Sequence, residues 1–255
     1  MTVTRRPSVL VFAGADPSGG AGIAADILAI AAQGAHALPV ITALTVQDND
    51  RVFAVEPVAP ELLRRQAQAL IDRIAIDAVK IGIPGSAANA AAIAQLIGQW
   101  RLVRPSLPVV LDPVLASGHG DVLSRDDAVL ALAPLLPVTT IIVPNGPEAL
   151  ALGGVENLLA QGCRHVLVTG GHGEGDEVLN RWVDAHGGER AWRWPRLPGA
   201  FHGSGCTLAS AIAARLALGQ ALPDALAQAQ SYCHAALAGA YAIAPGQLMP
   251  QRFIQ

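Results

Sequence analysis

The segment 201–210, FHGSGCTLAS, places a glycine-rich turn and a cysteine at the expected start of a helix. Gly203 and Gly205 allow backbone N–H groups to approach an anion closely, and the positive end of the helix dipole adds to the attraction. One interpretation is a cradle for phosphate oxygens. The other is a plain loop-to-helix junction with Ser204 as its N-cap. The segment alone does not separate the two.

Cys206 has four candidate roles: nucleophile, metal ligand, proton acceptor or small buried side chain, which is the usual fate of a free cysteine. A covalent intermediate is disfavoured, because no triad-like partner is evident apart from the nearby His202. Cys163 and Cys233 are too widely spaced for a disulfide framework or a metal site, and we expect both to be buried. Three unpaired cysteines fit the reducing cytoplasm.

Apolar strand-like runs alternate with helical patterns along almost the whole chain, which predicts an α/β fold with a mainly parallel central sheet. Several strands are apolar without alternation, as strands covered by helices on both faces require. We expect one domain over residues 1–255. The expected strands are 8–14, 37–44, 51–58, 78–83, 108–113, 139–145, 164–171, 177–184 and 189–195; the expected helices are 21–34, 60–73, 86–101, 125–134, 204–218 and 223–243, with two short pieces after 145.

Polar loops follow the strands of this pattern. They read GADPSGG, TVQDND, GIPGS, DPVLASGHG, PNGPE and TGGHGEG. Ligands of open α/β sheets bind outside the carboxyl ends of the strands, where all of these loops are expected to lie. The sequence therefore predicts the active site at this edge.

Composition excludes several other classes of protein. The chain has 255 residues, 52% of them hydrophobic and 15% charged, with a formal net charge of −3, so disorder is not expected. No Lys/Arg run exceeds two residues, which argues against nucleic acid or a membrane surface as a partner. The short apolar run after Arg6 predicts a first strand, not a signal peptide. Neither the dinucleotide fingerprint G-x-G-x-x-G nor a Walker-type phosphate loop is present.

The motifs AGADPSGGAGIAAD, ITALTVQ, LDP, PNGPE, TGGH and HGSGCTLASAIAA occur in this order over residues 8–245. In this combination the chain resembles the hydroxymethylpyrimidine/phosphomethylpyrimidine kinases of thiamine synthesis. The resemblance implies a ribokinase-like three-layer αβα sandwich. It also implies transfer of phosphate from ATP, with Mg²⁺, to the hydroxymethyl group of 4-amino-5-hydroxymethyl-2-methylpyrimidine. A second transfer, from monophosphate to diphosphate, is the family expectation.

The resemblance implies a pyrimidine site built from four residues. Gln47 matches the residue that hydrogen-bonds the aminopyrimidine, because a side-chain amide offers both a donor and an acceptor. Gly14 and Ala21 fall where the backbone passes the ring, and Asp26 matches an aspartate of the first helix. A solvated loop position for Gln47, and a structural cap or ion pair for Asp26, are the alternatives.

The nucleotide side is implied in the same way. Asp112 and Glu148 match the residues that organise Mg²⁺, which prefers a few carboxylates together with phosphates and waters. Glu148 as a first-turn helix carboxylate is the alternative. The residues expected near the nucleotide phosphates are Asn145, Thr169, Gly170 and Gly171.

In this family context Cys206 occupies the position of the catalytic aspartate of sugar kinases. Together with Gly203, Ser204 and Gly205 it is expected to face the reacting groups. We interpret the thiol as the proton acceptor, or as a hydrogen-bond partner, of the hydroxymethyl oxygen that attacks the γ-phosphate in line. A thiol pKa of about 8.5 is expected to be lowered at a helix N-terminus.

The chain also departs from the family. Thr169 stands where a lysine is usual, and the only lysine of the chain, Lys80, lies on a different strand, so Mg²⁺, backbone amides and an arginine must compensate. The segment 149–170 is shorter than in relatives, which leaves the nucleotide preference open. The rivals are a pyridoxal kinase and a pyrimidine-binding relative with weak catalysis. Segments 50–58 and 177–195 offer a surface for a homodimer.

Overall fold

One twisted sheet runs through the molecule. The computed structural model describes residues 5–116, 121 and 127–253. Within these residues nine strands pair in the order β3-β2-β1-β4-β5-β6-β7-β8-β9. Their bounds are β1 Ser8–Ala15, β2 His36–Gln47, β3 Val52–Pro57, β4 Ala78–Ile81, β5 Val109–Leu111, β6 Ile141–Ile142, β7 His165–Val168, β8 Glu177–Asp184 and β9 Glu189–Pro195.

The centre of the sheet is parallel, and antiparallel strands lie at both edges. The pairs from β2 through β1, β4, β5 and β6 to β7 are all parallel. The pairs β2–β3, β7–β8 and β8–β9 are antiparallel. The carboxyl ends of the central strands therefore meet at one edge, where the loops that follow them converge.

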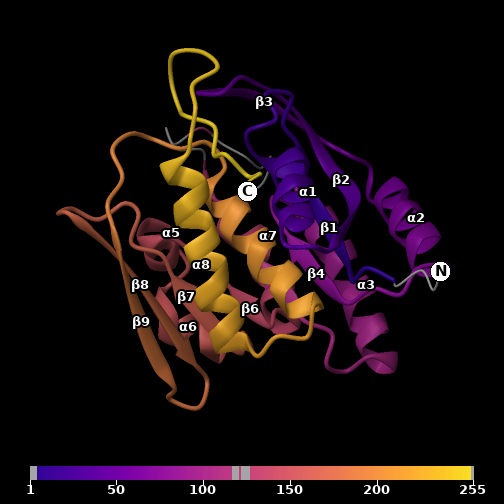
Figure 1. Cartoon of the computed structure of the whole chain (residues 1–255). Helices are drawn as coiled ribbons and strands as arrows, with labels where there is room; N and C mark the ends of the chain where they lie inside the picture. Colours follow the sequence, from indigo (N-terminus) through magenta and orange to yellow (C-terminus); the bar gives the residue numbers. More distant parts are fainter. Residues whose placement is uncertain (1–4, 117–120, 122–126, 254–255) are drawn as a thin grey trace.

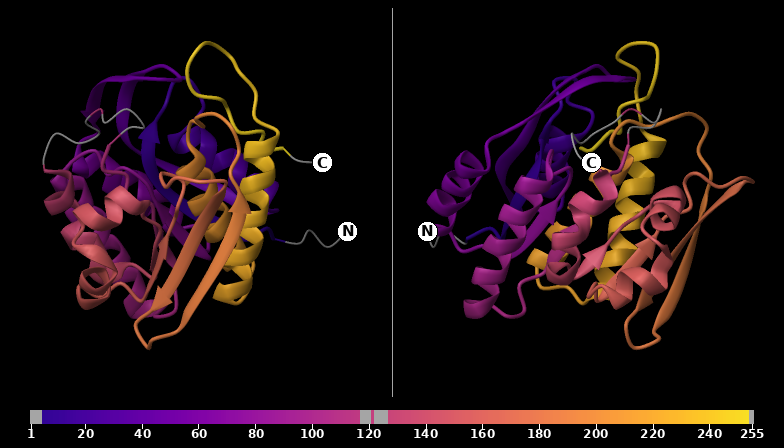
Figure 2. Two further views of the ribbon diagram at one scale, coloured as in Figure 1. Left: turned by 90° about the vertical axis from the view of Figure 1, so that its left-hand side faces the viewer. Right: turned by 180° about the vertical axis from the view of Figure 1, so that it is seen from behind.

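Helices cover both faces of the sheet, so the molecule has three layers. Figure 1 shows α1, α7 and α8 together on one face, and the views of Figure 2 show the remaining helices on the other. The helices are α1 Gly22–Ala32, α2 Pro60–Ile71, α3 Ala87–Val103, α4 Ala128–Leu132, the 3₁₀-helix η1 Ala133–Val138, α5 Gly146–Ala151, α6 Gly154–Ala160, α7 Ser204–Ala217 and α8 Leu222–Ala238. The predicted three-layer αβα sandwich with a mainly parallel central sheet is confirmed.

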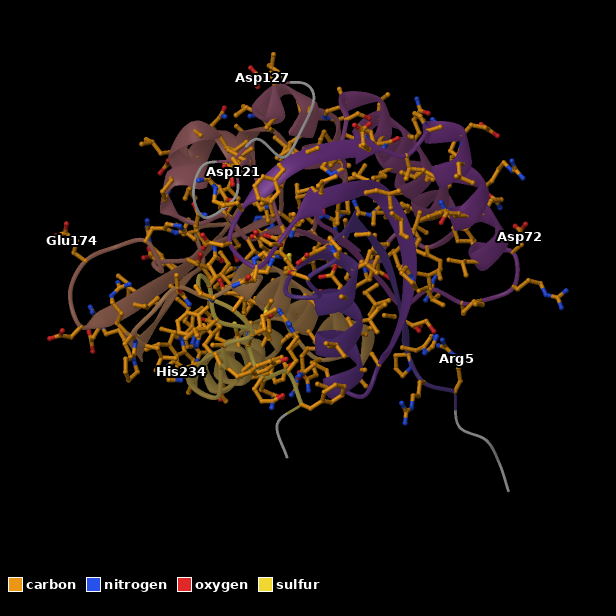
Figure 3. The ribbon with its side chains drawn as sticks, turned by 90° about the horizontal axis from the view of Figure 1, so that it is seen from above. Arg5, Asp72, Asp121, Asp127, Glu174 and His234 are labelled. Atoms are coloured by element: carbon orange, nitrogen blue, oxygen red, sulfur yellow. The ribbon has the colours of Figure 1, made fainter. Side chains whose placement is uncertain are left out.

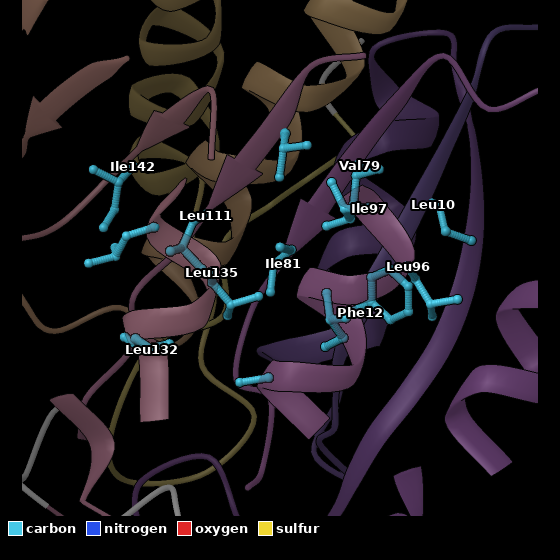
Figure 4. Packing of buried hydrophobic residues seen from close by; sticks show 14 of the residues in the cluster. Leu10, Phe12, Val79, Ile81, Leu96, Ile97, Leu111, Leu132, Leu135 and Ile142 are labelled. Atoms are coloured by element: carbon cyan, nitrogen blue, oxygen red, sulfur yellow. The ribbon is translucent and has the colours of Figure 1, made fainter. Parts of the chain in front are cut away.

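The strand residues divide between two cores, one on each face. Leu10 and Phe12 of β1 point into the core beneath α3, while Val9 and Val11 point into the core beneath α1, α7 and α8. Figure 4 shows the first core, in which the side chains of β1, β4, β5 and β6 meet those of α3 and η1. Because both faces are buried, these strands read as continuous apolar runs.

Two predicted helices differ from the structure. The helix expected over 125–134 appears as α4 followed by η1 in its described part, since Pro134 and Pro137 interrupt regular α-helical hydrogen bonding; residues 125 and 126 lie outside the described residues. The helix expected over 223–243 ends at Ala238. The chain beyond it returns along the molecule, and Tyr241 and Phe201 form isolated bridges with Met249 and Leu248. None of the described helices is long and apolar enough to cross a membrane.

Candidate active site

The GSGC turn joins the loop after β9 to helix α7. Gly203 is the N-cap, with φ +70, and Ser204 is already the first helical residue, so the alternative in which Ser204 caps the helix is wrong. A Cβ atom at position 203 would lie 2.1 Å from the carbonyl oxygen of Gly20, so the turn requires glycine there. No side-chain hydrogen bond caps α7. Its first N–H groups are therefore available to an anion, as a phosphate cradle requires.

Cys206 lies in the first turn of α7, and its side chain is half-buried. Burial raises the pKa of its thiol to about 12, although the nearby Lys80 acts in the opposite direction. The expected lowering of this pKa by the helix N-terminus is therefore wrong, because loss of water outweighs the dipole. Cys206 is a neutral thiol at pH 7. This favours the second of its two interpretations, a hydrogen-bond partner of the hydroxymethyl oxygen.

The other two cysteines are buried, as expected. The Cys163 thiol lies 3.5 Å from the carbonyl oxygen of Leu136, and the Cys233 thiol lies 3.6 Å from that of Ser204. All three cysteines are free.

A fully buried lysine lies beneath the turn. The Nζ atom of Lys80, on β4, is 2.8 Å and 3.0 Å from the two carboxylate oxygens of Asp26 and 3.9 Å from Oδ2 of Asp112. Burial alone lowers the pKa of Lys80, but Asp26, Cys206 and Asp112 together outweigh it and raise this pKa. The hydroxyl of Ser210, on α7, donates to Asp26 at 2.7 Å. Strand β4, helix α1 and helix α7 are thus tied together under the site.

Asp26 is among the residues expected to bind the pyrimidine, and its side chain is completely buried on Lys80 and Ser210. The alternative considered for it, a structural ion pair, is the arrangement present in the structure. Contact between Asp26 and a substrate stays a prediction.

Asp112 follows β5 and is turned toward the GSGC turn. A Cβ atom at position 205 would lie 3.4 Å from Asp112 Oδ1. Among the described residues, no group forms a hydrogen bond with Asp112 Oδ2, although the atom is buried. Burial raises the pKa of Asp112, and Lys80 opposes this rise. An orphaned buried carboxylate oxygen at the carboxyl edge of the sheet is a fitting ligand or water partner for a cation.

Glu148 lies on α5 and forms a capping box with Asn145. The Asn145 N–H donates to Glu148 Oε2 at 2.8 Å, and the Glu148 N–H donates to Asn145 Oδ1 at 2.9 Å. Burial first, and then the charge of Asp112, raise the pKa of Glu148 to about 7. Glu148 is thus a first-turn helix carboxylate, the alternative considered for it, and the negative charge of Asp112 also acts on it. The two carboxylates are therefore close enough to interact electrostatically, and their shared role with magnesium stays a prediction.

The TGGHGEG turn follows β7 beside α5. Thr169 pairs with Asn145 in an isolated parallel bridge, and the Gly170 N–H donates to the side chain of Asn180 at 3.0 Å. The structure thus brings Asn145, Thr169, Gly170 and Gly171 together. Glu174, at the tip of the turn, points away from the body of the molecule (Figure 3).

Arg196, the residue after β9, holds this turn through backbone carbonyl oxygens. Its guanidinium donates to the carbonyl oxygens of Gly175 at 2.7 Å, Gly171 at 2.8 Å and Glu177 at 3.1 Å. An arginine held by backbone carbonyls puts a fixed positive charge at the turn that carries Thr169.

The predicted pyrimidine residues surround the loop after β1. Ala21 is the N-cap residue of α1, and its N–H donates to Asp16 Oδ2 at 2.7 Å. A Cβ atom at Gly14 would lie 2.7 Å from Ile83, so the glycine gives this side chain its space. Gln47, the last residue of β2, places its amide nitrogen 3.4 Å from Nε2 of His202. Gln47 therefore faces the segment that leads into the GSGC turn.

Three residues of the site were not among the sequence predictions: Lys80, Arg196 and His202 as a partner of Gln47. From the sequence, Lys80 is expected to lie away from the phosphate site because it is on another strand. The parallel pairing nevertheless brings its strand, β4, directly between β1 and β5. A lone lysine in an otherwise apolar strand, AVKIGI, is the signal that identifies it, since a buried lysine needs an acidic partner. Nothing in the sequence near Arg196 indicates its partners.

Solved structures that superpose on this chain include a pyridoxal kinase and a phosphomethylpyrimidine kinase. The chain superposes on pyridoxal kinase from Bacillus subtilis, solved as an ADP complex, with a TM-score of 0.87, 25% identity, and coverage of 97% of this chain and 98% of that one. It superposes on phosphomethylpyrimidine kinase from Clostridium difficile 630 with a TM-score of 0.76, 32% identity, and coverage of 90% and 98%. Fold and site together define a ribokinase-like phosphotransferase.

Sequence relatives give the narrower assignment. The family model described as phosphomethylpyrimidine kinase matches residues 16–250. The hydroxymethylpyrimidine/phosphomethylpyrimidine kinase of Streptomyces coelicolor is 38% identical over 94% of this chain and 92% of its own length. The chain belongs to the phosphomethylpyrimidine kinase family.

Proposed function

We propose that the protein transfers the γ-phosphoryl group of ATP to the hydroxymethyl oxygen of 4-amino-5-hydroxymethyl-2-methylpyrimidine. The monophosphate is then phosphorylated to the diphosphate, which supplies thiamine diphosphate synthesis. The chain is 38% identical to the Streptomyces coelicolor kinase, which is named for both reactions, and 25% identical to the Bacillus subtilis pyridoxal kinase. The higher identity supports the pyrimidine as the substrate. The observation that carries the proposal is the uncapped N-terminus of α7 with Cys206 in its first turn, above Lys80 and Asp112.

The substrate hydroxyl needs orientation more than a strong base, because the transition state of phosphoryl transfer is loose. Its oxygen forms a bond to the γ-phosphorus while the bond from that phosphorus to the bridging oxygen of ADP breaks, and the hydroxyl proton passes to water. The neutral Cys206 thiol orients the hydroxyl by hydrogen bonding. The N–H groups at the start of α7 stabilise the charge that develops on the phosphoryl oxygens.

Asp112 and Glu148 would hold Mg²⁺ through its water shell, and the ion would supply positive charge that offsets the negative charge of the phosphates. The orphaned Oδ2 atom of Asp112 and the raised pKa of Glu148 fit such an ion. Within the described part of the chain, no cluster of three or more His, Cys, Asp and Glu residues could hold a metal alone.

We further propose that residues 1–255 act as one kinase domain in the cytoplasm, where the three cysteines stay reduced. A homodimer would form over strands β2 and β3. Leu44, Val46 and Phe53 on these strands are 55%, 57% and 68% exposed. Such apolar side chains grouped on two paired strands favour association.

Release of ADP in a coupled assay tests the proposal. The purified protein with Mg-ATP is given the aminopyrimidine or pyridoxal at equal concentration. We expect kcat/KM to be higher for the aminopyrimidine. Faster turnover of pyridoxal would assign the protein to the rival activity. Tight binding of the pyrimidine with no release of ADP from any substrate would identify a binding protein.

A further inference from the structure

His202 connects two loops of the candidate pyrimidine site. Its Nε2 atom is 2.8 Å from Oδ2 of Asp16, in the loop after β1, and 3.4 Å from the amide nitrogen of Gln47, at the end of β2. The side chains of His202 and Asp16 are only 14% and 3% exposed. The Nε2 atom of His202 therefore has two polar partners in a site that is largely buried from solvent.

The chemistry of Nε2 allows it to donate or to accept, but not both. Asp16 is an ionised acceptor: burial opposes ionisation, yet His202, Ser18 and the Ala21 N–H together lower the pKa of Asp16. A carboxylate at 2.8 Å requires a proton on Nε2, since two lone pairs would otherwise face each other. With its proton directed to Asp16, Nε2 has no lone pair with which to accept from an amide N–H of Gln47.

The Nε2–H group of His202 therefore finds a favourable partner on Gln47 only in the carbonyl oxygen of the side-chain amide. We propose that His202 is a positioning residue that turns the Gln47 amide so that Oε1 faces Nε2 and the NH₂ group faces the substrate. This inference rests on the proposed function, because it concerns how the same site recognises its pyrimidine. It makes His202 and Asp16 determinants of specificity at a distance from the transferred phosphate.

An amide fixed in this orientation selects one arrangement of donors and acceptors. The NH₂ group donates to a ring nitrogen, and the second lone pair of Oε1 accepts from an exocyclic amino group beside it. A 4-oxo pyrimidine in its lactam form presents the opposite pattern, a ring N–H beside a carbonyl oxygen. Binding that compound would require the amide to turn over and lose the His202 bond, so the 4-oxo analogue should be rejected.

The surroundings of His202 keep its ring in place. Its backbone N–H donates to the carbonyl oxygen of Leu248 at 2.9 Å. A Cβ atom at Gly20 would lie 2.1 Å from the imidazole, so the loop after β1 packs directly on the ring. The guanidinium of Arg252, which is 3% exposed, donates to the carbonyl oxygens of both Gly20 and His202. The C-terminal segment thus fastens the loop after β1 to the segment that carries His202.

The test compares kcat and KM for 4-amino-5-hydroxymethyl-2-methylpyrimidine and its 4-oxo analogue. We expect the natural protein to prefer the amino compound at least 100-fold in kcat/KM. His202→Phe, which removes the donor, should reduce this preference at least tenfold, mainly through KM for the amino compound. His202→Gln restores an N–H donor at similar reach and should keep the preference within about threefold of the natural protein. His186→Phe, in the exposed turn between β8 and β9, is the matched control and should change nothing.

A second measurement does not depend on turnover or on a folded variant. Nitrogen-15 NMR of the natural protein should find the His202 proton on Nε2. A proton on Nδ1 only, or an unchanged preference in a folded His202→Phe protein, would overturn the inference. If the natural protein phosphorylates neither pyrimidine, the proposed function fails. Calorimetric binding of the two compounds then tests the role of His202 separately.

Discussion

Lys80 is the residue whose loss should damage the protein most. Its ammonium is fully buried and is shared between Asp26, at 2.8 Å, and Asp112, at 3.9 Å. Replacing it with methionine keeps most of the side-chain volume and removes the charge. Two buried carboxylates then remain without their cation. Removing one partner of a buried ion pair typically costs about 3–5 kcal/mol.

This cost is a large part of the stability of a single domain, which is about 5–15 kcal/mol. For a chain of this length a loss of 1 kcal/mol lowers Tm by about 2–4 °C, so Lys80→Met should lower it by about 6–20 °C. Denaturant unfolding followed by far-UV circular dichroism gives the free energy of unfolding directly. The double variant Lys80→Met/Asp26→Asn should recover about half of the loss, since it leaves one buried charge fewer.

A matched control is the exposed pair of Arg181 and Glu189, which are 51% and 52% exposed with a closest N···O distance of 2.6 Å. Arg181→Met should lower the free energy of unfolding far less than Lys80→Met, because solvent screens an exposed pair. A Lys80→Met protein that is destabilised no more than Arg181→Met would refute the reasoning that the buried lysine holds the site together.

Three further results are expected. Cys206→Ala should lower kcat about 10- to 100-fold in the ADP-release assay. Cys206→Ser should lower kcat less, because a hydroxyl still orients the substrate. Full activity of the alanine variant would contradict the role of the thiol. The pKa of Glu148 rises from 4.5 in the unfolded chain to about 7 in the fold. Without Mg²⁺, the free energy of unfolding should therefore fall as pH rises between these values, by about 1–2 kcal/mol after solvent screening. Glu148→Gln should remove this part of the pH dependence when Tm is measured from pH 4.5 to 8. Arg196→Gln should raise KM for ATP about tenfold and leave KM for the pyrimidine unchanged, because the guanidinium supports only the turn after β7; equal changes in both constants would argue against this division.

The sequence predicted the parallel sheet well, because strands buried on both faces consist of apolar residues and little else. It placed the end of the last helix too late. Ala240, Ala242 and Ala244 are good helix formers, but the chain after Ala238 instead pairs Tyr241 with Met249. That pairing is a tertiary contact, which local periodicity does not reveal.

Within the site, the sequence predicted which loops meet but not the charges beneath them. Asp26 and Lys80 are 54 positions apart, and they meet because α1, which carries Asp26, packs on β1 beside β4. The pKa of Cys206 was misjudged for a similar reason. The helix N-terminus is visible in the sequence, whereas the burial of the thiol depends on packing by other segments.

Phosphorus NMR of the protein with Mg-ATP and 4-amino-5-hydroxymethyl-2-methylpyrimidine tests the central claim most directly. The account predicts the signal of the pyrimidine monophosphate, followed by that of the diphosphate, as ATP is converted to ADP. A reaction that stops at the monophosphate would show that Thr169 and Arg196 do not support the second transfer. Intact ATP with no phosphorylated pyrimidine would contradict the assignment of this kinase activity.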